Sequence, residues 1–133
     1  MIEIILGFLY SSFLEYYLHK IPLHNWGGVF RDHILIHHKL SAKDMKDNEY
    51  NDVIFGKNEI VVAIIVCLLH LPLILIYKNF YFSIVFYVFL YLILHRISHT
   101  NSNFAKSWMQ WHYYHHCINS KKNFGIRSEE HTS

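Results

Sequence analysis

Three histidines lie on one face of a single predicted helical turn in the segment WHYYHH, residues 111–116. His112, His115 and His116 stand at positions i, i+3 and i+4, which are neighbours on the surface of an α-helix. A buried histidine needs a polar partner, so three in one stripe are costly unless something binds them. A transition metal ion would bind them, because neutral imidazole is a common metal ligand in proteins.

Three further histidine clusters precede this segment, with spacings that suit metal ligands. They contain His19 and His24 in HKIPLH, His33, His37 and His38 in HILIHH, and His95 and His99 in HRISH. Pro22 prevents a regular helix through the first cluster, whereas the i and i+4 pairs in the other two predict helices. A tetrahedral zinc ion needs only four ligands, so ten histidines could hold two metal ions with coordination positions left open. Open positions indicate chemistry rather than a closed structural site.

Apolar segments separate these clusters. No Asp, Glu, Lys or Arg occurs between Glu59 and Lys78, or between Lys78 and Arg96, so both runs are just long enough to cross a bilayer. Ile2–Leu18 is a third candidate, although two glutamates interrupt it. With 133 residues and 53% hydrophobic content, the chain is predicted to be all-α. We expect an integral membrane helical bundle with about three spanning helices and a histidine-rich helical cap in the cytosol.

The order of the spans places all four histidine clusters on one side of the membrane. If the first span delivers His19 and His24 to one side, a hairpin of residues 59–94 leaves that side and returns to it with His95 and His99. The opposite loop holds only Lys78, so the positive-inside rule predicts that the histidine side is cytoplasmic. The chain also contains an internal repeat, residues 2–38 and 80–116. Each half has a predicted spanning helix, then two histidines where the chain leaves the membrane, then a helix with three histidines.

Several other classes of protein are excluded by composition or by missing motifs. A net charge of +2 is too small and too dispersed for a nucleic-acid partner, and two cysteines are too few for a disulfide framework. There is no basic segment or cleavage site of a signal peptide. The ExxH pairs of soluble di-iron bundles, the HExxH of zinc proteases and the CxxCH of attached haem are all missing from the sequence.

The four clusters, in this order and interleaved with apolar segments, resemble the histidine boxes of the fatty acid hydroxylase and sterol desaturase superfamily. EYYLHKIPLH resembles the first box and WHYYHHCINSKKNFGI the last, and the resemblance extends from about Gly7 to Ile126. It implies a membrane-bound oxidoreductase that hydroxylates or desaturates a lipid, such as a fatty acyl chain, a sterol or a carotenoid. Carried over position by position, the metal ligands would be His19, His24, His33, His37, His38, His95, His99, His112, His115 and His116.

The same resemblance implies the cofactors and partners. It implies two iron ions, with zinc possible in purified protein, and dioxygen as co-substrate. The lipid substrate should enter from the bilayer between the spanning helices. Since the chain contains no electron-carrier domain, a separate ferredoxin or b-type cytochrome with its reductase is implied as electron donor.

Three carboxylates are candidates to hold the ligating histidines by hydrogen bonds and so to tune the metals. They are Glu15, Asp32 and Asp44. Glu15 could equally be an interfacial carboxylate that reaches water, and Asp32 could simply cap the helix that follows it. Residues 41–58, which are polar and of mixed charge, are expected to form a solvated loop or a short surface helix.

The last seven residues, RSEEHTS, differ from the rest of the chain. After a motif like NFGI the family usually continues with Ser or Thr, then Pro-Leu-Trp-Asp, whereas residues 127–133 read like the translation of a sequencing-library adapter. We therefore expect residues 1–126 to form one fatty acid hydroxylase-like membrane domain. Residues 127–133 are expected to be a non-native tail on a truncated fragment.

Two other functions are compatible with a histidine-rich membrane protein. A metal-binding or metal-transport protein without oxygenase activity would place ligands within the spans, but only His70 lies at mid-depth. Because Pro72 follows it, His70 is expected to cap a backbone carbonyl. A bis-histidine haem cytochrome would leave most of the ten histidines without a role.

Overall fold

The computed structural model describes residues 1–23 and 33–118, and within these ranges it contains helices and no strand. The all-α prediction is confirmed for this part of the chain. His24, Asp32 and the predicted tail lie outside the described residues. The elements are α1 (Ile2–Leu18), η1 (His19–Leu23), η3 (His33–His38), α2 (Lys39–Ser41), η4 (Asn48–Asn51), α3 (Lys57–Leu69), η5 (Leu71–Leu75), α4 (Lys78–Thr100), α5 (Ser102–Trp108) and α6 (Gln110–Cys117).

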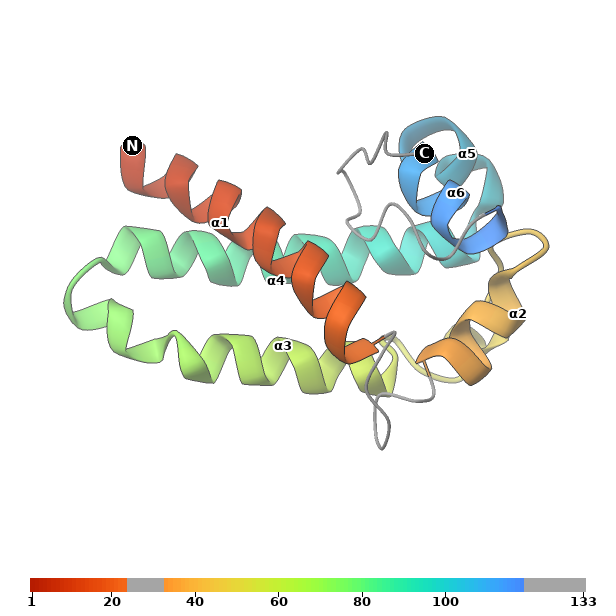
Figure 1. Ribbon diagram of the computed structural model, residues 1–133, viewed down its shortest axis with the longest axis horizontal. Coiled ribbons are helices and arrows are strands. Elements are labelled where there is room, and N and C mark those ends of the chain that lie inside the picture. The colour runs from red at the N-terminus through yellow and green to blue at the C-terminus, as the bar shows by residue number, and fades with distance from the viewer. Residues whose placement is uncertain (24–32, 119–133) are drawn as a thin grey trace.

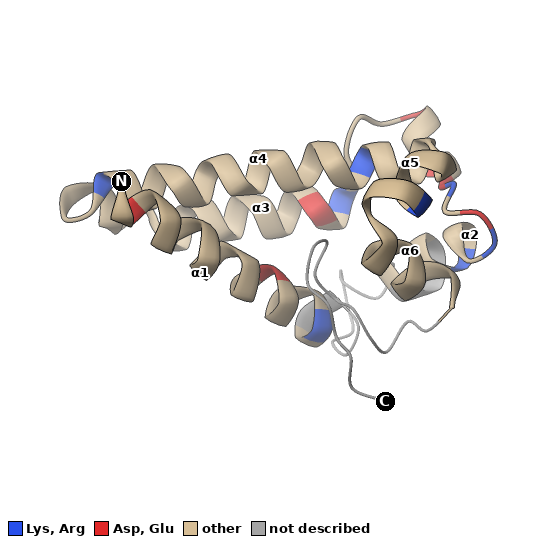
Figure 2. Cartoon of the chain, turned by 90° about the horizontal axis from the view of Figure 1, so that it is seen from above, with Lys and Arg blue, Asp and Glu red and all other residues tan. Residues whose placement is uncertain are grey.

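Three long helices form one end of the molecule, and the short helices gather at the other (Figure 1). Helices α3 and α4 make an antiparallel hairpin, and α1 crosses α4 obliquely. Helices α2, α5 and α6 lie near the C-terminal end of α4, far from the N-terminus. Charged residues follow the same division, since they are sparse along the long helices and denser around the short ones (Figure 2).

Close approach of α1 to α4 depends on Gly7. A Cβ atom at this position would overlap the side chain of Ser83 and would come within 2.9 Å of the Phe80 carbonyl oxygen. Ser83 donates a hydrogen bond from Oγ to the Ile4 carbonyl oxygen at 2.9 Å, and Ser11 donates to the Gly7 carbonyl oxygen at 2.7 Å. Small residues that let two helix backbones approach, with hydroxyls bonded to backbone carbonyls, are typical of helix pairs in membranes.

The hairpin turns earlier than the sequence suggested. We expected a span over residues 59–77 and a turn at Lys78, but α3 ends at Leu69 and η5 follows as a 3₁₀ turn, so that Lys78 begins α4. Pro72 cannot continue an α-helix, which explains the early end. His70 donates from Nδ1 to the Val66 carbonyl oxygen at 2.7 Å, as the capping interpretation predicted, and its Nε2 accepts from the Tyr10 hydroxyl at 2.6 Å.

Among the described residues, one helix is both long and apolar enough to cross a membrane, namely α4. Its 23 residues rise about 35 Å at 1.5 Å per residue. Helix α1 has 17 residues and α3 has 13, so α3 alone rises only about 20 Å. The predicted bundle of three spanning helices therefore stays a prediction, and α4 is the described helix that has the length and composition of a span.

Candidate metal centre

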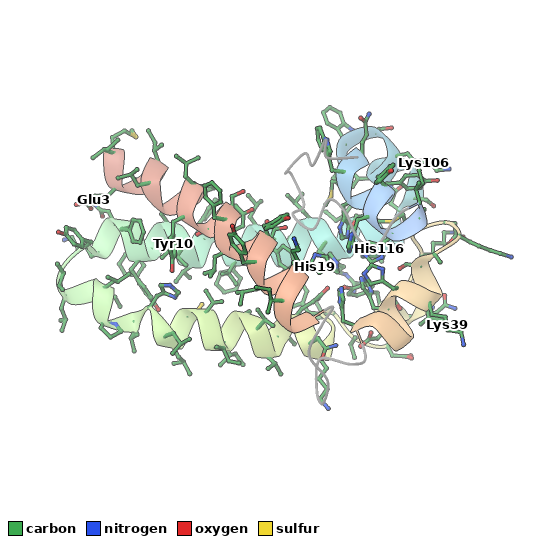
Figure 3. The ribbon with its side chains drawn as sticks, in the orientation of Figure 1. Glu3, Tyr10, His19, Lys39, Lys106 and His116 are labelled. Atoms are coloured by element: carbon green, nitrogen blue, oxygen red, sulfur yellow. The ribbon has the colours of Figure 1, made fainter. Side chains whose placement is uncertain are left out.

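Eight buried histidines form two groups of four where the long helices meet the short ones. The first group is His19, His33, His38 and His115, and the second group is His37, His95, His99 and His116. Within each group the ring nitrogens that could bind an ion all lie within 4.8 Å of one another. Each of the eight is at most 7% exposed. His19, at the end of α1, and His116, on α6, mark the two groups in Figure 3.

Consecutive histidines divide between the groups. His37 belongs to the second group and His38 to the first, while His115 belongs to the first and His116 to the second. Neighbouring helical residues point about 100° apart, so each pair serves two sites at once. The rings of His38 and His116 stack at a centroid distance of 4.2 Å, which places the two groups side by side.

The second histidine cluster differs from its predicted geometry. We expected His33 and His37 to share a face at i and i+4, but the segment His33–His38 is a π-helix. In this segment, where the turn is wider than in an α-helix, His33 and His38 belong to one group and His37 to the other. Single π-helical turns occur often at functional sites.

Distances within the first group suit a shared metal ion. The Nε2 atom of His33 lies 2.7 Å from that of His19 and 3.2 Å from that of His38. The Nε2 atom of His115 lies 3.2 Å from that of His19. Two imidazole nitrogens bound to one ion at about 2.0–2.1 Å lie about 2.9–3.4 Å apart for tetrahedral or octahedral angles. The four rings therefore already converge on one point.

The second group is held from outside through its Nδ1 atoms. His37 bonds to the Asp47 carboxylate at 2.5 Å, His99 donates to the Met45 carbonyl oxygen at 2.6 Å, and His116 lies 2.8 Å from the Ser41 hydroxyl. His95 forms an ion pair with Glu59. Metal-bound histidines usually bond in this way through the nitrogen that does not face the metal. The arrangement directs the Nδ1 atoms outward, so that the Nε2 atoms face the interior of the group, where that of His99 also meets His112.

Three of these Nε2 atoms, those of His37, His95 and His116, are buried and have no hydrogen-bond partner among the described residues. A buried polar atom without a partner costs roughly 1–3 kcal/mol, so the arrangement is unfavourable unless an ion binds there. Burial lowers the pKa of His37, and lowers that of His116 further, with neighbouring histidines adding to the effect on His116. Neutral imidazole is the form that binds a metal. The donor set therefore fits two transition metal ions.

His112 lies against the second group. Its Nε2 atom is 3.0 Å from that of His99, and its ring centroid is 4.5 Å from that of His116. Nδ1 of His112 is buried and finds no partner in the described part of the chain. Nine of the ten histidines predicted as ligands are thus together, and the tenth, His24, lies outside the described residues.

Two carboxylates that the sequence analysis did not single out bond to histidines of the second group, while Asp32 lies outside the described residues. Glu15 accepts a hydrogen bond from the Tyr87 hydroxyl and lines an apolar cavity that His19 also lines. Asp44 is exposed, and its Oδ1 accepts from the Lys46 backbone N–H at 3.1 Å. The carboxylates that bond to histidines in the second group are Asp47 and Glu59.

The supporting segment, residues 41–59, contributes several side chains that hold the second group. We expected residues 41–58 to form a solvated loop or a short surface helix, and many of them are exposed, but others are buried beside the histidines. Met45, Asp47 and Tyr50 in this segment are at most 4% exposed. The Tyr50 hydroxyl donates to Glu59 and lies 3.0 Å from Nδ1 of His95. Burial raises the pKa of Tyr50, so the hydroxyl keeps the proton that it donates. Glu59 stands three residues after Gly56 and accepts a hydrogen bond from its backbone N–H at 3.0 Å. A glutamate at this position is common in the first turn of a helix, so the spacing in the sequence could have indicated this bond.

Arg96 fixes this supporting segment to α4. Its Nη1 donates to the carbonyl oxygens of Tyr50, Val53 and Ile54 at 3.3, 3.0 and 2.8 Å. Its guanidinium also lies over the Tyr50 ring at 5.5 Å. Arg96 follows His95 directly, so the same turn of α4 supplies a histidine and anchors the segment that holds it.

Comparisons of this chain with protein-family models, with curated proteins and with solved structures found no match. The histidine groups and their hydrogen bonds are thus the basis for any assignment of function.

Proposed function

We propose that this chain is a membrane-bound di-iron oxidoreductase that hydroxylates or desaturates a lipid. The observation that carries the proposal is the pair of adjacent four-histidine groups. Each of two consecutive pairs, His37–His38 and His115–His116, gives one residue to each group. Two nitrogen-rich sites side by side suit a pair of redox metal ions better than one structural zinc. Bound iron would supply the activation of dioxygen and the removal of hydrogen from an unactivated C–H bond.

The chain's own contribution would be to hold the ions in a dry site and to bring a hydrocarbon to them. A narrow cavity of about 60 Å³ lies between α1, α3 and α4 and is lined mainly by apolar side chains, among them Leu14, Val62 and Ile84. His19 of the first group also lines it. A short segment of lipid chain in this cavity would reach the first metal site without passing through water.

The outer surface of the long helices supports a membrane location for the whole bundle. Large apolar side chains are exposed on each helix, including Phe13 on α1, Leu69 on α3 and Phe86 on α4, which are 67%, 73% and 60% exposed. Such a surface would be costly in water and favourable in lipid. We place the histidine groups on the cytoplasmic side, where a ferredoxin or b-type cytochrome with its reductase could supply electrons.

A comparison of two histidine variants tests this proposal. Lipids and pigments of a host that expresses the chain are compared with those of hosts expressing His115→Ala or His70→Ala. His115 belongs to the first group, whereas His70 lies at the other end of α3, so only His115→Ala should abolish a hydroxylated or desaturated product. A product that persists unchanged in His115→Ala would contradict the oxygenase.

A further inference from the structure

A second cavity reaches the histidine groups from the side of the supporting segment 41–59. Its volume is about 310 Å³, compared with about 60 Å³ for the apolar cavity. His33 of the first group and His37 and His95 of the second group form part of its wall. The rest of the wall includes polar and charged residues, among them Glu49 and Asn58, and we call this cavity the polar cavity for that reason. One polar cavity therefore touches both candidate metal sites.

Glu59 and Tyr91 line both cavities and so stand between them. Both residues are fixed in place by His95, because Glu59 is ion-paired with it and the Tyr91 ring stacks on it at 5.3 Å. Glu59 is held further by the Gly56 N–H and the Tyr50 hydroxyl. The partition between the apolar and the polar cavity is thus part of the histidine scaffold itself.

The two cavities differ in what they can admit. A hydrated divalent cation that enters the mainly apolar cavity loses water and meets few replacement ligands, which is costly. The two carboxylates that line this cavity are already engaged, Glu15 by the Tyr87 hydroxyl and Glu59 by His95. In the polar cavity, Glu49, Asn58 and Glu59 offer oxygen atoms that can replace water in steps before imidazole binds. The Lys57 ammonium at the rim is exposed to solvent, so its repulsion of a cation is largely screened by salt.

We propose that the polar cavity is the entrance through which divalent metal ions reach the two histidine groups from water, and that the apolar cavity is closed to them. This inference rests on the metal-binding part of the proposed function and is independent of oxygenase activity. In this scheme, metal ions enter through the polar cavity on the side of segment 41–59, and lipid enters the apolar cavity on the side of α1.

A blocking experiment on the purified, metal-free full chain tests the entrance. In a Cys67→Ser and Cys117→Ser background, Lys57→Cys is modified with a bulky, charged thiol reagent, and uptake of Co²⁺ is followed by its visible absorption. Lys57 lines the polar cavity, so modification should slow uptake by about tenfold or more, because cation entry depends on an open, favourable path. Asn103→Cys, exposed on α5, is the matched control and should load at the unmodified rate.

A charge variant gives an independent measure that does not require labelling. Lys57→Glu should raise the uptake rate of Co²⁺ roughly threefold at low ionic strength, and the gain should vanish at high salt. Lys106→Glu makes the same charge change on α5, away from the cavity lining, and should leave the rate unchanged.

The outcomes separate this inference from the proposed function. If Co²⁺ binds but modified Lys57→Cys loads as fast as modified Asn103→Cys, the entrance is wrong and the metal centre stands. The same conclusion follows if modification of Ala63→Cys, in the apolar cavity, slows loading instead. If no variant binds Co²⁺ at all, both the metal centre and its entrance are overturned.

Discussion

At the scale of single residues, a hydrogen bond to Nδ1 of a histidine distinguishes a carboxylate that orients a metal ligand from an ordinary surface carboxylate. Asp47 is 3% exposed and bonds to His37, whereas Asp44, three residues earlier, is exposed and bonds only to backbone as far as the described contacts show. Asp47→Asn should weaken metal binding by about 10–100-fold, since loss of such a partner misorients the ligand. Titration with a competing chelator measures the affinity.

Asp44→Asn is the matched control for this experiment, because it makes the same chemical change in the same segment. Its metal affinity should equal that of the unaltered chain. Equal affinities for Asp47→Asn and Asp44→Asn would show that His37 does not depend on its carboxylate, and would remove this reason for assigning it as a ligand.

The buried imidazoles also predict how stability depends on pH. Burial lowers the pKa of His112 and His116 well below 6.5, while the same side chains in the unfolded chain titrate near 6.5. As pH falls below about 6.5 the unfolded state therefore binds more protons than the folded state, and the free energy of unfolding decreases. Metal-free chain in detergent should melt at a lower temperature at pH 5.5 than at pH 7.5.

His116→Asn tests whether these residues cause the pH effect. Asparagine keeps a polar side chain but does not titrate, so the difference in melting temperature between the two pH values should shrink in this variant. A metal-free chain that melts at the same temperature at both pH values would contradict the burial of neutral histidines.

At the scale of elements, the crossing of α1 and α4 depends on the missing side chain of Gly7. Gly7→Ala forces α1 away from Ser83 and Phe80, and overpacking of this kind costs about 1–3 kcal/mol. The variant should have a lower melting temperature. Gly56→Ala is the control, because a Cβ there meets its nearest atom at 3.6 Å, an ordinary contact, and should change stability little. Equal melting temperatures for the two variants would contradict the close packing.

Arg96 couples α4 to the supporting segment 41–59. Arg96→Met keeps an unbranched chain but removes the three hydrogen bonds to backbone carbonyls, so residues 47–54 should exchange their amide hydrogens faster and the metal affinity should fall. Hydrogen exchange read by mass spectrometry measures the first effect. Lys106→Met is the control, since Lys106 contacts the Tyr113 ring instead. Unchanged hydrogen exchange over residues 47–54 in Arg96→Met would show that the hydrogen bonds of Arg96 do not hold this segment.

The elements also show where sequence reasoning succeeded and where it stopped. The i and i+4 spacing of His95 and His99 predicted their shared face correctly, because α4 is a regular helix through both. The same spacing brings the ring centroids of His33 and His37 to within 5.2 Å of each other, but it could not show that they belong to different groups in the π-helical segment. Residues 41–58 were predicted to be a solvated loop or a short surface helix, and many of them are exposed. The histidine partners of Asp47 and Tyr50 lie outside this segment, so only the tertiary structure reveals them.

At the scale of the whole molecule, the chain divides into an apolar end and a histidine end. The long helices expose apolar side chains, while the buried residues of the opposite end include nine of the histidines. The predicted internal repeat is visible in this division. Three histidines of the first group come from residues 2–38 and one from residues 80–116, and the second group has the reverse composition. Neither half can complete a group alone.

The iron content of the purified chain tests the central claim most directly. Protein isolated from iron-supplied cells and washed with a weak chelator should contain about two iron ions per chain, one for each histidine group, and should show no haem absorption band. One zinc ion per chain, no bound metal or a haem spectrum would contradict the assignment of two adjacent iron sites.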